Sequence, residues 1–261
     1  MRSKIEVENN IRRVAELISE SGLTISLSGA GMSTESGIPD FRSPGTGIWE
    51  KIDPVKFGSI NSFLAGFDLK EIMKLAEGMD ISKIFTAEPN EGHKALAELE
   101  EMGKLECIVT QNIDMLHHRA GNRNVIEIHG SIRTSSCMYC GKKMEFEEFL
   151  AKAMEQQRIP PICECGGIIK PDVVFFGEML PQDALSRSME YARKCDLFLS
   201  VGSSLVVYPV ANLPPLAKKS GAKLVIINMQ RTPYDGIADV VIHEKAGEVL
   251  PKIVAEVKRM V

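Results

Sequence analysis

Short runs rich in β-branched residues alternate with amphipathic helical segments along most of the chain. Helices are expected over residues 7–18 and 94–102, just after Asp114, over 182–194 and 210–219, and at the C-terminal end. Strands are expected over residues 23–27, 105–110, 125–129, 173–176, 197–201, 223–228 and 240–242. Because a helix between two strands lets them run in the same direction, this order predicts an α/β fold with a doubly wound, Rossmann-like parallel sheet.

Two stretches interrupt this alternation. Residues 43–89 contain several turn formers and show no clear strand. Weakly amphipathic helical pieces are expected there, with Phe63, Phe67, Ile72 and Leu75 as their apolar residues. Residues 131–169 contain four of the six cysteines, and we expect both stretches to pack together as a smaller second domain. The predicted division is a Rossmann-like domain of residues 1–42, 91–130 and 171–261, a helical insertion at 43–90 and a cysteine module at 131–170.

Composition and charge exclude several classes of protein. The 261 residues carry 31 Lys and Arg against 35 Asp and Glu, so no surface is predicted to attract nucleic acid phosphates or anionic lipid. The N-terminus has no apolar targeting segment, and the longest aliphatic run, residues 224–227, is too short to span a membrane. We therefore expect a cytoplasmic protein with no membrane partner, whose cysteines stay reduced.

Four cysteines form two pairs with the spacing of metal ligands. The first pair is a CxxC knuckle, and the second has one intervening residue where two are usual. The predicted ligands of one Zn²⁺ ion are Cys137, Cys140, Cys163 and Cys165. Because four protein ligands leave no open coordination position, the zinc is predicted to be structural; the alternative is a cluster of buried, reduced thiols.

The remaining two cysteines, and the segment between the two cysteine pairs, are predicted to have packing roles. Cys107 and Cys195 adjoin apolar strands and are predicted to lie in the core. A helical face that can cover the metal site is formed by Phe146, Phe149, Leu150, Ala153 and Met154.

A glycine-rich turn at residues 29–31 directly follows the first expected strand. In a doubly wound fold such glycines let the main chain approach a pyrophosphate. Thr34 stands in place of the third glycine of the usual dinucleotide fingerprint, and no acidic residue follows at the expected distance on a second strand. The turn therefore disfavours an ordinary dehydrogenase.

The turn continues into the string GAGMSTESGIPDFR at residues 29–42, which strongly resembles the sirtuin family, the NAD-dependent protein-lysine deacylases, in its prokaryotic type. The resemblance continues in order at residues 110–114 (TQNID), 128–130 (IHG), both cysteine pairs, 171–178 (PDVVFFGE), 201–209 (VGSSLVVYP) and 227–228 (IN). It extends from about residue 22 to the final helix, and residues 43–88 are its variable part.

This resemblance implies that NAD is a consumed cosubstrate. The residues that it assigns to NAD are Gly29, Ala30, Gly31, Ser33, Ile38, Asp40, Phe41, Arg42, Gln111, Asn112, Ile113, Asp114, Gly202, Ser203, Ser204, Asn228, Met229, Gln230 and Ala246. Within this set, residues 29–33 would line the pyrophosphate and residues 40–42 would belong to a closing loop. Residues 112–114 with Ile38 would bind nicotinamide and its ribose, and Asn228 the adenosine ribose.

The resemblance also implies the catalytic residues, His129 and Asn112. His129 ends an alternating strand at the carboxyl edge of the expected sheet, where it would act as the general base. Among the other histidines, His93 and His117 match positions that look structural, and His118 and His243 match no useful position.

The implied reaction transfers the acetyl group of acetyl-lysine to ADP-ribose and yields nicotinamide, deacetylated lysine and 2′-O-acetyl-ADP-ribose. An acetyl-lysine protein or peptide would bind in extended form against Val174, Phe175, Phe176, Gly177, Glu178, Val206, Val207 and Tyr208. Family members that remove succinyl or malonyl groups carry a Tyr-x-x-Arg pair in the variable part. Residues 43–88 contain neither tyrosine nor arginine, so an uncharged acyl group, acetyl first, is expected.

Two alternatives remain open at this point. Mono-ADP-ribosyl transfer would use the same cofactor site with a protein side chain as the acceptor. A zinc-ribbon module that binds nucleic acid is the other alternative, but the basic residues of 131–170 are nearly balanced by acidic ones, so no nucleic acid partner is expected.

Overall fold

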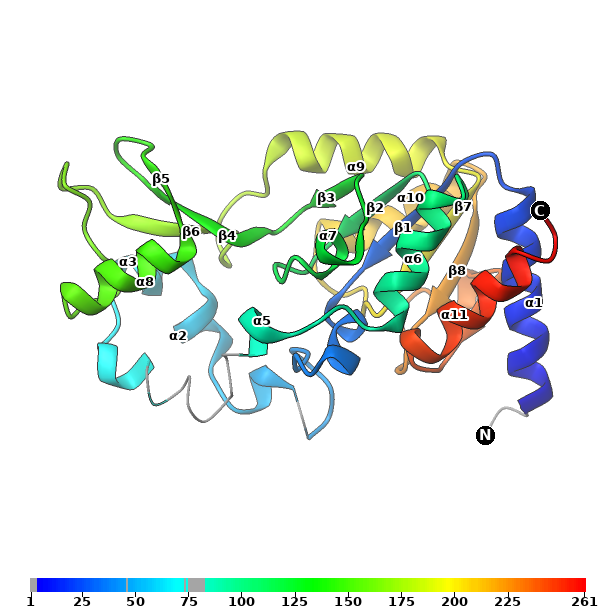
Figure 1. Ribbon diagram of the computed structural model, residues 1–261, viewed down its shortest axis with the longest axis horizontal. Coiled ribbons are helices and arrows are strands. Elements are labelled where there is room, and N and C mark those ends of the chain that lie inside the picture. The colour runs from blue at the N-terminus through cyan, green and yellow to red at the C-terminus, as the bar shows by residue number, and fades with distance from the viewer. Residues whose placement is uncertain (1–3, 46, 73, 75–82) are drawn as a thin grey trace.

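The computed structural model describes residues 4–45, 47–72, 74 and 83–261, and it places a larger and a smaller part side by side (Figure 1). The larger part contains a parallel sheet with helices on both faces, and the smaller part contains a short antiparallel sheet. In the described ranges, no helix combines the length and the apolar character that crossing a membrane requires.

Six parallel strands form the main sheet in the order β3-β2-β1-β7-β8-β9. Their bounds are β1 (Thr24–Ser28), β2 (Cys107–Thr110), β3 (Val125–Glu127), β7 (Leu197–Val201), β8 (Lys223–Ile227) and β9 (Val240–Ile242). The strand order reverses between β1 and β7, and ligands of such sheets bind outside the carboxyl ends of the strands at this switch point. The predicted doubly wound parallel sheet is confirmed.

Helices cover both faces of this sheet because its strands are apolar on both sides. In β7, Leu197 and Leu199 pack in one buried cluster with α1 (Lys4–Glu20), α6 (Glu91–Glu101) and α11 (Ala246–Val257). Phe198 points to the opposite face and packs with α9 (Gln182–Lys194) and α10 (Leu213–Lys219). A short helix, α7 (Leu116–Ala120), follows Asp114 as predicted.

The smaller part contains the antiparallel sheet β5-β4-β6. Its strands are β4 (Gly130–Cys137), β5 (Lys143–Glu145) and β6 (Ile169–Val173), and α8 (Phe146–Glu155) packs against them. Phe149 and Ala153 of α8 are buried. Leu150 and Met154 are 40% and 46% exposed, because they lie one residue further round the helix. Only part of the predicted helical face therefore covers the module.

The prediction of a strand at residues 173–176 is wrong. The strand in this region is β6, which ends at Val173 and pairs with β4 outside the parallel sheet. Beyond it, the Val174 N–H donates to the His129 carbonyl and the Phe176 N–H donates to the Gly58 carbonyl, both over 2.8 Å. The apolar run is extended because the main chain finds these partners, and its sequence did not specify which ones.

The described residues of the insertion contain short helices, as predicted. Among them are α2 (Pro54–Gly58), α3 (Ile60–Ala65), α5 (Lys83–Thr86) and the helical residues 69–72. The prediction of a helical position for Phe67 is wrong, and Leu75 lies outside the described residues. The Phe63 ring lies 4.9 Å from the Phe175 ring, and Phe67 forms an isolated β-bridge with Ile159. The insertion and the cysteine module thus touch, and the exact division into domains stays a prediction.

Two histidines lie in the core beside the main sheet. His93 is fully buried, and its ring lies 4.9 Å from the ring of His117. His117 Nε2 is 2.8 Å from the Ser28 hydroxyl oxygen, whereas neither ring nitrogen of His93 has a hydrogen-bond partner among the described residues. Burial lowers the pKa of both side chains, that of His93 to about 4. Both histidines are therefore neutral in the folded protein at neutral pH.

This pair predicts that stability falls in mild acid. Since the folded pKa of His93 lies below its unfolded value, the stabilisation is complete above about pH 6.5 and is lost as the pH falls toward 4. Between pH 7.5 and pH 5, His93 alone should reduce the free energy of unfolding by about 2 kcal/mol. Urea unfolding at the two pH values measures this loss. A His93→Leu variant with the same pH dependence as the wild type would contradict it.

Candidate active site and metal centre

Three glycines at the switch point pack main chain against main chain. The Gly29 N–H donates to the Val201 carbonyl over 3.0 Å, and the Gly31 N–H donates to the Gly202 carbonyl over 2.8 Å. Gly202 has a φ of 61°, and a Cβ there would lie 2.2 Å from the Met32 nitrogen. A residue with a side chain does not fit, so the ends of β1 and β7 meet closely and leave a turn made of main chain.

A chain of polar side chains lies beside this turn. The Ser33 hydroxyl donates to the Asp114 carboxylate over 2.6 Å, and the Asn112 amide donates to the Ser33 hydroxyl over 3.0 Å. Asp114 is only 8% exposed, and burial raises the pKa of its carboxyl. Met115 has a φ of 63°, a left-handed conformation that costs energy for a residue with a side chain and is enriched at functional sites. These contacts hold an amide and a buried carboxyl in fixed positions.

His129 lies two residues beyond β3, at the carboxyl edge of the sheet. Its Nδ1 is 3.0 Å from the Gln111 carbonyl oxygen. A carbonyl can only accept, so we assign the hydrogen of the neutral ring to Nδ1, which leaves the lone pair of Nε2 available as a base. Burial lowers the pKa of His129, and the ring is therefore unprotonated at neutral pH. This is the state that a general base requires.

One cavity of about 900 Å³ brings most of the predicted site residues together. Its volume is in the range of small-molecule sites. The predicted residues that line it are Gly29, Ala30, Gly31, Ser33, Ile38, Asp40, Phe41, Arg42, Gln111, Asn112, Ile113, Asp114, His129, Val174, Phe175, Phe176, Gly177, Glu178, Gly202, Ser203, Ser204, Val207, Tyr208, Asn228 and Gln230. Residues as far apart in the sequence as Gly29 and Gln230 therefore line a single cavity.

Three predicted residues do not line the cavity. Met229 is 52% exposed and Val206 is 45% exposed, although each has a neighbour in the lining. Ala246 is buried at the start of α11, where it packs in the core cluster with α6. The contact with NAD predicted for Ala246 therefore has no support in the cavity lining.

Sequence reasoning missed the contribution of the insertion. Trp49 lines the cavity, and its ring lies 5.1 Å from the Phe41 ring and 6.0 Å from the Phe176 ring. The further lining residues not predicted are Pro39, Ser43, Ile48, Gly58, Ile84, Val173, Met179, Leu180, Gln182, Leu185 and Pro209. The one usable signal was that Trp49 is the only tryptophan of the chain.

The four paired cysteines converge in the smaller part. All four sulfur atoms lie within 4.8 Å of one another, with 3.5 Å between Cys137 and Cys165 and 3.9 Å between Cys140 and Cys163. Tetrahedral Zn–S bonds of about 2.3 Å place sulfurs roughly 3.8 Å apart, so the donor set fits Zn²⁺. A Cβ on Gly167 would lie 2.7 Å from the Cys137 sulfur, which explains the glycine after the second pair. By contrast, Cys107 and Cys195 are buried in the main core, as predicted.

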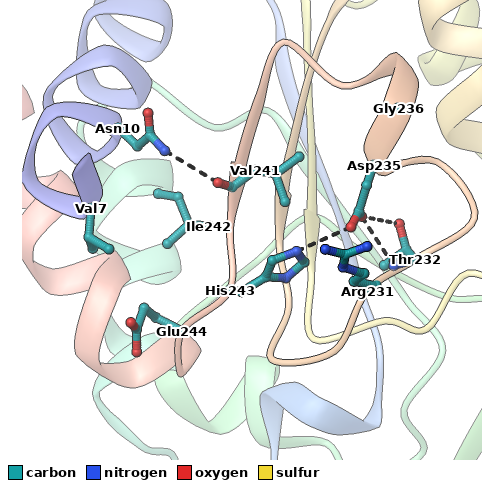
Figure 2. Close-up of a pocket in the computed structure, with 10 residues that line it drawn as sticks. All are labelled: Val7, Asn10, Arg231, Thr232, Asp235, Gly236, Val241, Ile242, His243 and Glu244. Carbon is teal, nitrogen blue, oxygen red and sulfur yellow. Dashed lines mark hydrogen bonds and ion pairs between the residues drawn. The ribbon is translucent and has the colours of Figure 1, made fainter. Parts of the chain in front are cut away.

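A second cavity of about 720 Å³ lies between α1, β9 and the loop at residues 231–236 (Figure 2). In it, His243 Nε2 pairs with the Asp235 carboxylate at 3.1 Å, and the Asn10 amide donates to the Val241 carbonyl at 3.3 Å. None of the predicted site residues lines this cavity. We therefore place the active site in the larger one.

Comparison with known proteins agrees with this geometry. The sequence profile described as "Sir2 family" matches residues 29–209. The chain is 47% identical to "NAD-dependent protein deacylase 2" of Archaeoglobus fulgidus over 97% of this chain and 98% of the relative. It is 46% identical to "NAD-dependent protein deacetylase 1" of Pyrobaculum aerophilum, over 97% of this chain and 96% of the relative.

Solved structures show the same fold. A structure described as "Structural Basis for the Mechanism and Regulation of Sir2 Enzymes" superposes with a TM-score of 0.85 at 46% identity, covering 97% of this chain and all of the other. A Sir2 structure with a p53 peptide and NAD⁺ superposes with a TM-score of 0.83 at 40% identity, covering 94% of this chain and 98% of the other. The chain belongs to the Sir2 family, the sirtuins.

Proposed function

We propose that this chain is an NAD-dependent protein-lysine deacetylase. It transfers the acetyl group of acetyl-lysine to ADP-ribose and releases nicotinamide, deacetylated lysine and 2′-O-acetyl-ADP-ribose. The observation that carries the proposal is that His129, Asp114 and residues 174–178 all line one cavity at the switch point of the sheet. The reaction named for the relatives supports the same assignment. The cytoplasmic location and the lack of a nucleic acid partner stay predictions from the sequence.

The polar groups of the cavity fit NAD. Both N–H groups of the Asn112 amide are taken by the Gly29 carbonyl and the Ser33 hydroxyl, so Asn112 offers its amide oxygen and Asp114 offers its carboxyl group. These are partners that a carboxamide N–H and a ribose hydroxyl need. The glycine turn at residues 29–31 would lie along the pyrophosphate, and Asn228, which also lines the cavity, would contact the adenosine ribose. When bound, NAD would supply an electrophilic ribose carbon, with nicotinamide as the leaving group, for the transfer of the acyl group.

His129 would move the proton that the transfer requires. Its Nε2 accepts the proton of a ribose hydroxyl, while the Gln111 carbonyl keeps Nδ1 protonated and the ring correctly oriented. Because burial lowers its pKa, the base is ready at neutral pH without a charged partner. Activity should decline in acid as this ring becomes protonated.

The peptide would bind as an added strand beside residues 174–178. Among the described residues, the Val174 carbonyl and the Gly177 N–H have no hydrogen-bond partner. Val174 and Gly177 line the cavity together with Val207 and Tyr208, and their free main-chain groups suit a main-chain partner in extended form. The aromatic walls formed by Trp49 and Phe176 would enclose the apolar stem of the acyl-lysine and exclude water.

An uncharged acyl group is expected to be removed at least tenfold faster than a succinyl group, because a carboxylate against these walls would lose its hydration. The lining residues that the insertion contributes beyond Ser43 are Ile48, Trp49, Gly58 and Ile84, and none carries a charge. The test compares kcat/KM for acetyl, propionyl and succinyl forms of one peptide, each with and without NAD. The propionyl peptide controls for size, since it is larger than acetyl and also uncharged. Faster removal of succinyl than of acetyl would refute the specificity, and acetyl removal without NAD would refute the function.

A further inference from the structure

A mostly buried ion pair holds together the main-chain segment beside which the peptide would bind. Lys170 Nζ is 3.2 Å from the Glu178 carboxylate, and the two side chains are only 15% and 21% exposed. The same ammonium donates to the Val173 carbonyl over 2.7 Å and to the Pro171 carbonyl over 3.1 Å. It also lies 5.2 Å from the centre of the Phe175 ring. One cation therefore contacts both ends of segment 173–178.

Glu178 also bonds to the main chain of this segment. Its carboxylate accepts the Phe175 N–H over 2.8 Å, and its own N–H donates to the Phe175 carbonyl over 3.0 Å. Without Lys170, the Glu178 carboxylate would stay mostly buried, and no second cation among the described residues pairs with it. A buried carboxylate without a cation destabilises the protein by more than the ion pair stabilised it, so segment 173–178 would rearrange.

The position of segment 173–178 bears directly on the site. The Val174 N–H donates to the carbonyl of His129, and the Phe176 N–H and carbonyl bond to the insertion at Gly58 and Ile60. Residues 173–178 all line the active-site cavity, whereas Lys170 does not. Lys170 thus acts on the cavity only through the main chain that it holds.

We propose that Lys170 is a positioning residue for the acyl peptide: its ammonium fixes segment 173–178 in the shape that presents the Val174 carbonyl and the Gly177 N–H to the substrate. This inference rests on the proposed function. It predicts an effect on peptide binding alone, since the residues proposed to bind NAD follow β1, β2 and β7, and Lys170 lies on β6.

The test is the Lys170→Met variant, which keeps the apolar stem and removes the charge. KM for an acetylated peptide should rise about tenfold, while KM for NAD stays within twofold of the wild type. Lys170→Arg should recover most of the lost peptide affinity, because a guanidinium can reach the same carboxylate. The matched control is Lys194→Met, which removes the cation of an exposed ion pair with Glu190 on α9 and should change neither constant.

The outcomes separate this inference from the function it rests on. A wild-type protein that does not deacetylate with NAD defeats the proposed function. An active wild type whose Lys170→Met variant keeps the peptide KM, or loses peptide and NAD affinity equally, defeats the role of Lys170. If Lys170→Met melts early, the comparison is made with Lys170→Arg and Lys170→Gln at a temperature where all variants are folded. An unchanged peptide KM in Lys170→Gln then overturns the inference.

Discussion

Replacing His129 by alanine is expected to lower kcat for deacetylation about 10³-fold, the usual loss when a general base is removed. Nε2 of this ring is the proposed base, His129 lines the cavity, and the Gln111 carbonyl holds the ring through Nδ1. The change removes an imidazole without disturbing the glycine turn or the Asp114 network, so NAD should still bind and zinc should stay in place. The measurement is the rate of acetyl-peptide turnover at saturating NAD.

His118→Ala is the matched control for this prediction. His118 lies on α7 and pairs with Glu127 at 3.5 Å, and it does not line the active-site cavity. Its removal should leave kcat within about twofold of the wild type. Retained turnover in His129→Ala, or an equal loss in both variants, would show that the base has been assigned to the wrong residue.

Loss of the metal is expected to unfold the smaller part of the protein. Apparent zinc-binding free energies in small Cys/His modules reach about 10–16 kcal/mol, and much of this energy is folding energy. The buried cluster around the cysteines is small, with Phe63, Met144, Phe149 and Ile169 as its fully apolar members. The variant Cys163→Ala should therefore lose zinc and peptide turnover together, and its melting curve should show an additional transition at lower temperature.

Cys195→Ala provides the comparison, since it removes a thiol from the main core far from the paired cysteines. It should keep one zinc per chain and lose only about 1 kcal/mol of stability through the small cavity it creates. Zinc content by atomic absorption and thermal unfolding decide between the two cases. Full zinc content in Cys163→Ala, or no effect of a strong chelator on the fold of the wild type, would contradict a structural metal.

The main sheet was predictable because its strands coincide with short apolar runs in the local sequence. β7 and β9 were predicted with their full bounds, since a short apolar run, fully buried in β7 and buried at both ends in β9, leaves little choice of conformation. The run at residues 173–176 was misassigned for the same reason that β7 was correct. Hydrophobic runs of this length look alike, and only the partners of Val174 and Phe176 show that this one borders the cavity.

The site was predictable where motifs are continuous in sequence, as at residues 29–42 and 110–114. Lining residues outside these motifs were not predictable, because no local pattern marks them. Trp49 and Ile84 enter the lining from an insertion whose path depends on packing, such as the 5.1 Å contact between the Phe41 and Trp49 rings. In the sequence Lys170 is one of the basic residues of 131–170, and no local pattern identifies Glu178, eight residues further along the chain, as its partner. Such contacts are set by tertiary structure rather than by local pattern.

The central claim is that the acetyl group leaves lysine only by passing to the ribose of NAD. Mass spectrometry of a reaction containing the protein, an acetyl-lysine peptide and NAD tests this most directly. We expect nicotinamide, acetyl-ADP-ribose and deacetylated peptide in equal amounts. Free acetate without acetyl-ADP-ribose, ADP-ribose attached to the protein or peptide, or deacetylation in the absence of NAD would contradict it.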